Sequence, residues 1–147
     1  MTEASSTLAL VADIGGTNAR FALTDIATAH PVLSHSLSLP AADFASLQHA
    51  IEHYLAKVGA KPRLASLAVA CPVLGDDIRL TNRAWAFSQN ELKARLGLEH
   101  MLVINDFGAA ALAVLDIGDE DRVCLHGSQD QQRKGPITVI GPGTGLG

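Results

Sequence analysis

The sequence predicts a layered α/β domain, and three observations lead to this class. Apolar or alternating runs typical of strands cover residues 8–14, 18–25, 31–39, 64–70, 101–105 and 136–141. Segments with apolar residues three or four positions apart separate the later runs, as amphipathic helices would. With 147 residues, of which 48% are hydrophobic, the chain is long enough to bury a substantial core.

The first part of the chain predicts a meander of three strands. Residues 8–14 (LALVADI) form a short apolar run, and residues 18–25 follow a glycine pair with Phe21 and Leu23 at period two. Residues 31–39 continue the alternation through Leu37 and Leu39. We therefore expect three consecutive strands before the first helix.

Helices and strands alternate after the meander. The first helix is expected between Asp43 as N-cap and Gly59 as the left-handed residue after its last turn. A second helix is expected between Ser88 and Gly97, with Glu91 at capping-box spacing from Ser88. The remaining elements are strands at 64–70 and 101–105, a small-residue helix at 107–115 and a last strand at 136–141, with a polar stretch at 116–135.

Composition and charge exclude several classes of protein. A net charge of −4 without any basic run argues against a nucleic-acid binder. Cys71 and Cys124 match neither a metal spacing nor a disulfide framework, so reduced thiols are expected. The start MTEASSTLALVA has no basic leader and only a short apolar run, which argues against a signal peptide or membrane span. We therefore expect a cytoplasmic protein.

The glycine pair at residues 15 and 16 interrupts the predicted strands with a compact polar group. A dinucleotide fingerprint needs G-x-G-x-x-G leading into a helix, whereas a strand-like run follows here, and no Gly-Lys-Ser/Thr of a phosphate-binding P-loop is present. Two interpretations stay open: an ordinary turn between strands, or a turn whose N–H groups bind phosphate. In the second, Asp13 lies beside the turn, where it would hold a hydrated magnesium ion.

Two further segments favour the phosphate interpretation. Residues 139–147 (VIGPGTGLG) again lead from an apolar run into a glycine-rich turn, which contains Thr144. Asn105 and Asp106 follow the strand predicted at 101–105, at the strand end where α/β sheets bind ligands. Asp106 is either the N-cap of the next helix or a general base for a substrate hydroxyl in phosphoryl transfer.

The segment LTNRAWAFS (residues 80–88) offers Thr81 and Asn82 as polar groups beside Trp85, a combination that suits a sugar. For Trp85 a place in the core is the better interpretation. The segment HAIEH (residues 49–53) matches a zinc-protease pattern, but its two histidines would lie away from the apolar stripe of the helix and face water. A zinc site is therefore not expected.

Five motifs occur in the order found in bacterial glucokinases of the non-repressor type, and the chain resembles that family over nearly its whole length. They are DIGGTNARFAL, LAVACPVLGD, LTNRAWAFS, MLVINDF and GPGTGLG. The resemblance implies phosphorylation of glucose at its 6-hydroxyl, with ATP and Mg²⁺. It also implies the actin-like ATPase (ribonuclease-H-like) fold, an α/β architecture with a mixed sheet flanked by helices and two domains closing on a cleft.

The resemblance assigns roles by position. Asp106 would be the catalytic base, and glucose would contact Asn105, Asp106 and Gly145, with Thr81 and Asn82 as further candidates. The nucleotide phosphates would lie against Ala12, Asp13, Ile14, Gly15, Gly16, Thr17, Asn18, Gly143 and Thr144, and Asp13 would hold the metal through water. Residues 1–116 would form a small domain, residues 117–147 would begin a large one, and the full-length protein would be a homodimer.

Members of this family are longer than this chain, and the Glu and His residues that complete their glucose site lie further along their sequences. We therefore expect the chain to correspond to the front part of a glucokinase and to be inactive alone. Two alternatives are another sugar or acyl-group kinase of the superfamily and a non-catalytic module that senses sugar. A substrate panel distinguishes the first, and a helix-turn-helix unit ahead of the phosphate loop is typical of the second.

Overall fold

The computed structural model describes residues 7–29, 31–81, 84–127 and 135–141. The chain divides into two units, Met1–Asp106 and Phe107–Gly147. No helix in these described ranges is long and apolar enough to cross a membrane. The domain boundary expected at residue 116 stays a prediction.

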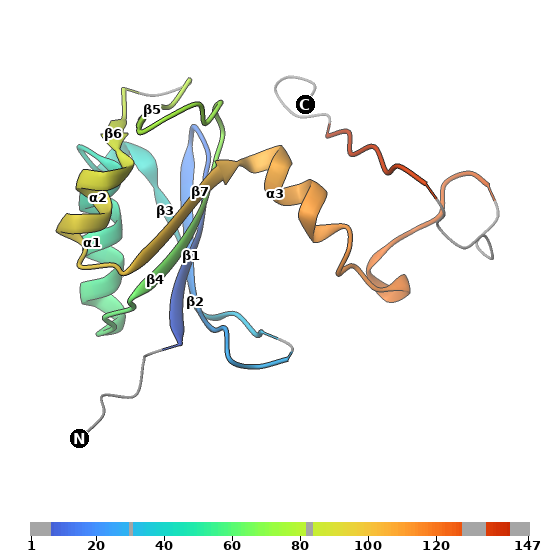
Figure 1. The fold of residues 1–147 in the computed structure, drawn as a ribbon, viewed down its shortest axis with the longest axis horizontal. Coiled ribbons are helices and arrows are strands. Elements are labelled where there is room, and N and C mark those ends of the chain that lie inside the picture. Colours follow the sequence, from blue (N-terminus) through green and yellow to red (C-terminus); the bar gives the residue numbers. More distant parts are fainter. Residues whose placement is uncertain (1–6, 30, 82–83, 128–134, 142–147) are drawn as a thin grey trace. The chain divides into compact units, whose positions relative to one another are not determined.

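The first unit is built on a five-stranded mixed sheet with the order β3–β2–β1–β4–β7 (Figure 1). Its strands are β1 (Leu8–Ile14), β2 (Asn18–Asp25), β3 (Ser34–Pro40), β4 (Leu64–Val69) and β7 (His100–Asn105). The predicted meander is confirmed, because β2 pairs antiparallel with both β1 and β3. On the other side of β1, strands β4 and β7 are parallel to it, as expected for strands linked through helices.

Helices α1 (Leu47–Val58) and α2 (Gln89–Arg95) cover one face of this sheet (Figure 1). The predicted N-cap at Asp43 is wrong, since the Ser46 side chain accepts a hydrogen bond from the His49 N–H at 3.2 Å. Asp43 instead ends the short 3₁₀ helix η1 (Ala41–Asp43), after which Phe44 is extended. The cap lies at Ser46 because Leu47, directly after it, is the first helical residue to enter the core.

The predicted ends of α1 and α2 and the predicted start of α2 are confirmed, while the helix predicted at 107–115 spans Asp106–Ala113. Gly59 and Gly97 both have φ of +66°, the left-handed conformation that glycine adopts without a Cβ penalty. Ser88 caps α2 by accepting a hydrogen bond from the Glu91 N–H at 3.1 Å. The strand pattern missed a hairpin before α2, formed by β5 (Asp77–Arg79) and β6 (Ala86–Ser88), because three residues are too few to show an alternation.

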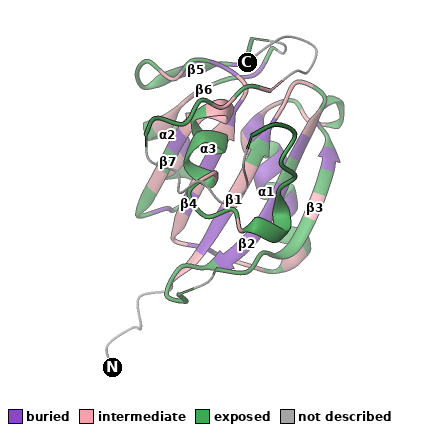
Figure 2. Cartoon of the chain, turned by 90° about the vertical axis from the view of Figure 1, so that its right-hand side faces the viewer, coloured by how far each residue is buried: buried purple, intermediate pink, exposed green. Residues whose placement is uncertain are grey.

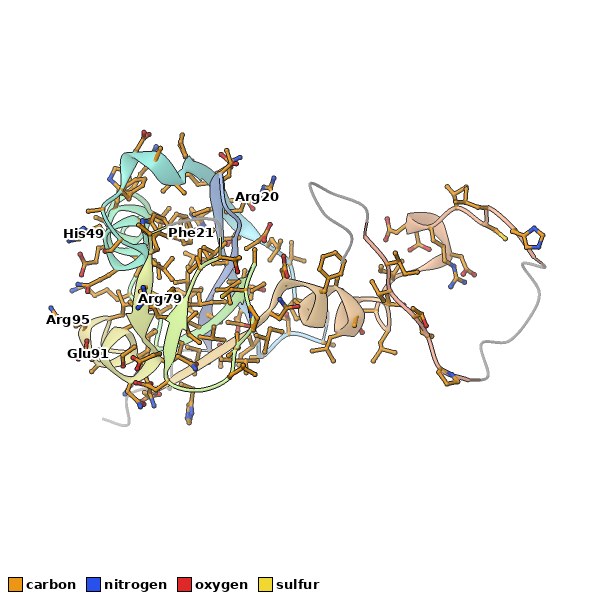
Figure 3. The ribbon with its side chains drawn as sticks, turned by 90° about the horizontal axis from the view of Figure 1, so that it is seen from above. Arg20, Phe21, His49, Arg79, Glu91 and Arg95 are labelled. Carbon is orange, nitrogen blue, oxygen red and sulfur yellow. The ribbon has the colours of Figure 1, made fainter. Side chains whose placement is uncertain are left out.

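The core lies between the sheet and its two helices. Phe21 of β2 stacks on Tyr54 of α1 with ring centroids 5.2 Å apart, and Figure 3 shows Phe21 on the helix side and Arg20 on the other. Buried residues run along the strands in Figure 2. The fully buried large side chains are Leu10, Ile14, Phe21, Leu47, Ile51, Tyr54, Leu67, Val69 and Ile78.

The second unit contains most of α3 (Asp106–Ala113) and the 3₁₀ helix η2 (Asp119–Asp121). None of its described residues is buried. The strand predicted at residues 136–141 is wrong, since this segment has no regular secondary structure. A strand requires a neighbour for its N–H and C=O groups, and no backbone hydrogen bond of this segment occurs among the described residues.

Candidate active site at the carboxyl edge of the sheet

Strands β1, β4 and β7 end level with one another. Ile14 is in register with Val69, and Val69 with Asn105. Beyond this row, the Ala70 N–H donates to the Ile14 carbonyl at 3.1 Å. The segments that follow the three strands therefore begin at one edge of the sheet, where open α/β sheets bind ligands.

The glycine turn joins β1 to β2 at this edge. The Gly15 N–H donates to the Asn18 carbonyl at 3.0 Å, which closes a tight turn over Gly15–Asn18. The Thr17 carbonyl accepts from the Ala41 N–H at 2.9 Å, so η1 holds the turn from the side. A Cβ on Gly15 would lie 3.5 Å from the Asn18 carbonyl oxygen, which is an ordinary contact. Space alone therefore does not require glycine at this position.

The side chains of the residues before the turn alternate between the two faces of the sheet. Ile14 is fully buried, so only its backbone is available at the edge, while Ala12 is half-buried. Asp13 lies opposite Arg20 in the ladder, and its Oδ2 accepts a hydrogen bond from Arg20 Nη1 at 2.7 Å. The two side chains are 52% and 64% exposed, so this carboxylate is open to water beside the glycine turn.

Asn105 and Asp106 form the polar end of β7. Asn105 Nδ2 donates to Asp106 Oδ1 at 2.9 Å and to the Cys71 carbonyl at 3.1 Å. Both side chains are half-buried. Burial raises the pKa of the Cys71 thiol, and the negative charge of Asp106 raises it further. The Asp106 carboxylate is thus held at the sheet edge by an amide that is itself anchored to the end of β4.

The residues proposed for sugar binding are described only in part. Thr81 is exposed and lies between β5 and β6, while Asn82 lies outside the described residues. Figure 1 shows this hairpin at the end of the sheet where β1, β4 and β7 end. Trp85 is 4% exposed, so its predicted place in the core is confirmed. Gly143, Thr144 and Gly145 of the second glycine-rich loop also lie outside the described residues.

The structure gives no support to a zinc site on α1. His49 and His53 are exposed, as predicted, and Figure 3 shows His49 directed away from the sheet. Across the described ranges there is no group of three or more His, Cys, Asp or Glu side chains that could hold a metal ion. Cys71 is buried and Cys124 exposed, and both thiols are free, as expected.

Sequence reasoning missed two contributors to this edge. Arg20 could have been found, because a turn closed over Gly15–Asn18 places residue 20 opposite residue 13 in the ladder. Cys71 could not, because it acts through its backbone carbonyl, and a carbonyl leaves no signal in the residue type.

Comparison with known proteins agrees with the resemblance in the sequence. The glucokinase family model matches residues 10–147. The chain is 45% identical over 138 residues to a glucokinase of Tolumonas auensis, covering 94% of this chain and 42% of that protein. It is 41% identical over 140 residues to a glucokinase of Psychromonas ingrahamii, covering 95% of this chain and 43% of that protein.

Solved structures agree as well. The crystal structure of a glucokinase from an Antarctic psychrotroph matches with a TM-score of 0.83 and 43% identity, covering 96% of this chain and 45% of that one. A glucokinase from Balamuthia mandrillaris, solved in complex with glucose, is 24% identical with a TM-score of 0.53, which shows a likeness of fold alone. The predicted fold class, with a mixed sheet flanked by helices, is confirmed. The chain spans less than half the length of the curated relatives it matches, and it belongs to the glucokinase family.

Proposed function

We propose that the protein transfers the γ-phosphoryl group of ATP to the 6-hydroxyl of glucose. The observation that carries this proposal is the level ending of β1, β4 and β7. It brings a glycine turn suited to phosphate and a half-buried carboxylate suited to a sugar hydroxyl to one edge of the sheet. Membership of the glucokinase family supports the same reaction.

Asp106 acts as the general base. Its carboxylate accepts the proton of the 6-hydroxyl as the hydroxyl oxygen attacks the γ-phosphorus and the bond to the leaving ADP oxygen breaks. Asn105 holds this carboxylate through its amide N–H, and glucose hydroxyls contact the pair. Thr81, Asn82 and Gly145 provide further sugar contacts.

The glycine turn binds the phosphates. The phosphates lie against the run Ala12, Asp13, Ile14, Gly15, Gly16, Thr17 and Asn18, in which the two glycines carry no side chain that would keep a phosphate from the backbone, and concave backbone turns of this kind favour anions. Gly143 and Thr144 bind the phosphates from a second loop. Phosphoryl transfer requires little beyond positioning and neutralisation of charge, which these groups supply.

Asp13 is the residue that would hold Mg²⁺. Mg²⁺ keeps most of its water and binds through one or two carboxylates together with substrate phosphates, so a single exposed carboxylate beside the phosphate turn fits this ion. When bound, the ion neutralises charge on the phosphate oxygens. Asp13 would hold it through water, with its carboxylate hydrogen-bonded by Arg20.

The proposal is tested by measuring ATP-dependent formation of glucose 6-phosphate by this chain and by a form extended to the length of its relatives. We expect turnover in the extended form and none in the chain alone. Asp106→Ala in the active form should lower kcat by about 10²- to 10⁴-fold while part of the glucose affinity remains. A loss smaller than about tenfold would refute the role of Asp106 as base.

A panel of sugars and carboxylic acids in the same assay identifies the substrate. Phosphorylation of another sugar or of an acyl group in preference to glucose would replace the proposed substrate. Binding of glucose without turnover in the extended form would favour a sugar-sensing module instead. A cytoplasmic location, a homodimer and the absence of nucleic-acid and membrane partners stay predictions.

A further inference from the structure

A short segment links the glycine turn to the β5–β6 hairpin. We infer that Ala41–Phe44, anchored by Trp85, is a strut that sets the position of Thr81 relative to the Gly15–Asn18 turn. At one end the Ala41 N–H donates to the Thr17 carbonyl at 2.9 Å. At the other end Trp85 Nε1 donates to the Phe44 carbonyl at 3.1 Å.

The strut is a single helical turn that is closed by its own backbone hydrogen bond. The Phe44 N–H donates to the Ala41 carbonyl at 3.4 Å, which completes the single 3₁₀ turn between the two anchor points. Ala41 is fully buried and Trp85 nearly so, so the residues that donate both hydrogen bonds lie out of solvent. We therefore expect a displacement at one end of the strut to reach the other end.

The strut holds the hairpin in addition to the buried side chains of Ile78 and Leu80. Strands β5 and β6 form a separate two-stranded sheet and share no ladder with the five-stranded sheet. The Leu80 N–H donates to the Trp85 carbonyl at 3.0 Å, so Trp85 closes the hairpin through its backbone and ties it to the strut through its side chain. Thr81 is the next residue after Leu80, and its position thus depends on Trp85.

Trp85 is a positioning residue in this scheme, because its indole bonds to the strut and is buried away from solvent. The effect of this role on catalysis rests on the proposed function, because Thr81 is a proposed sugar contact. The connection between the two loops does not rest on it and is tested separately.

The test compares Trp85→Phe with Tyr54→Phe in the whole chain. Both variants remove one hydrogen bond from a buried aromatic side chain to a backbone carbonyl and keep an aromatic ring; the Tyr54 hydroxyl donates to the His35 carbonyl at 3.0 Å, away from the strut. Amide hydrogen exchange is followed residue by residue by NMR. Trp85→Phe should speed exchange at both Leu80 and Ala41 by about fivefold, the factor expected for one net hydrogen bond, whereas Tyr54→Phe should leave both unchanged.

Faster exchange at Leu80 alone, with Ala41 unchanged, would overturn the inference, because the strut would then not join the two loops. Equal effects of the two variants would also overturn it, since they would indicate general loosening of the core.

Glucose and ATP affinities of the same variants, made in the form extended to the length of the relatives, test the positioning role. Trp85→Phe should weaken glucose binding by about fivefold and weaken ATP binding as well, because the other end of the strut bonds to Thr17 of the phosphate turn, and Tyr54→Phe should change neither. A change in melting temperature without a change in glucose affinity would mark Trp85 as merely structural and refute the positioning role. If the unmodified extended form binds no glucose, the proposed function fails, and the exchange at Ala41 alone decides whether the strut exists.

Discussion

The two units of the chain differ in whether they bury their apolar residues. Met1–Asp106 buries a continuous core in which Leu10, Ile51 and Leu67 have no exposed surface. Among the described residues of Phe107–Gly147 none is buried, and Leu125 is 94% exposed. Apolar residues occur in both regions, so their presence alone does not distinguish a region that packs from one that does not.

Helices α1 and α3 show the physical basis of this difference. Helix α1 places Leu47, Ala50, Ile51 and Tyr54 in the core. Helix α3 is built largely from alanine, the best helix former, and buries no residue. Alanine favours the helical conformation of α3, but eight residues are too few for propensity alone to make a helix stable in water, whereas α1 also gains free energy by removing apolar surface from water. The sequence pattern therefore predicts a helix in both units. Only in the first unit does the helix also bury side chains that stabilise the fold.

The largest expected effect is on the core of the first unit. Ile51→Ala should lower the free energy of unfolding by about 2–5 kcal/mol, because it leaves a cavity in a fully buried position. The matched change Leu115→Ala in the second unit should alter it by no more than about 0.5 kcal/mol. Urea unfolding measures both, and similar losses at the two positions would contradict the difference between the units.

A smaller loss of stability is expected from a change at the start of α2. This helix has Leu92 as its only buried residue, so it relies more on its cap than α1 does. Ser88→Ala should cost about 1 kcal/mol, because it removes the acceptor for the Glu91 N–H. Ser38, exposed on β3, provides the control, and its change to alanine should have little effect. Equal stability of Ser88→Ala and the unmodified chain in urea would show that the cap is unimportant.

Acid should also lower the stability of the region around the start of α2. Hydrogen bonds from the Ser88 hydroxyl, and next from the Asn90 N–H, lower the pKa of Asp76 below its ordinary value of 3.8. A lowered pKa in the folded state gives stability that is present above the unfolded pKa and is lost as the pH falls through the folded value. The contribution of Asp76 should therefore be complete at neutral pH and decline below about pH 4.

Melting temperatures measured between neutral and acidic pH check this prediction. Asp76→Asn should flatten the acid side of the profile, and Ser88→Ala, which removes one donor, should flatten it less. An unchanged profile in Asp76→Asn would show that these hydrogen bonds contribute nothing to stability.

The smallest effect on global stability is expected within the second unit. A Cβ on Gly141 would lie 2.5 Å from two ring carbons of Phe107, so Gly141→Ala must displace the ring. The free energy of unfolding should nevertheless change by no more than about 0.5 kcal/mol, because this unit contributes no buried residue to the core. NMR shifts of the Phe107 ring protons should move; unchanged shifts would show that the two residues are not in contact.

Much of the first unit could be predicted from local patterns. The strands ending at Ile14 and Asn105 and the glycine that ends α1 follow from apolar runs and a left-handed position. Predictions failed where a tertiary partner decides. Asp43 and Ser46 are both acceptable caps by residue type, and the choice depends on where the core begins, while the apolar run at 136–141 lacks a strand beside it among the described residues.

The candidate site was predictable in its residue types but not in its assembly. The sequence by itself determined a glycine turn after one strand and an Asn-Asp pair after another, because glycine content, apolar runs and strand ends are local properties. Only the tertiary structure decided that Ile14, Val69 and Asn105 share one row, that Arg20 pairs with Asp13, and that a buried tryptophan ties the hairpin to the turn. Register and side-chain-to-backbone hydrogen bonds join residues far apart in the chain. They are selected by packing of the whole core, which no local pattern contains.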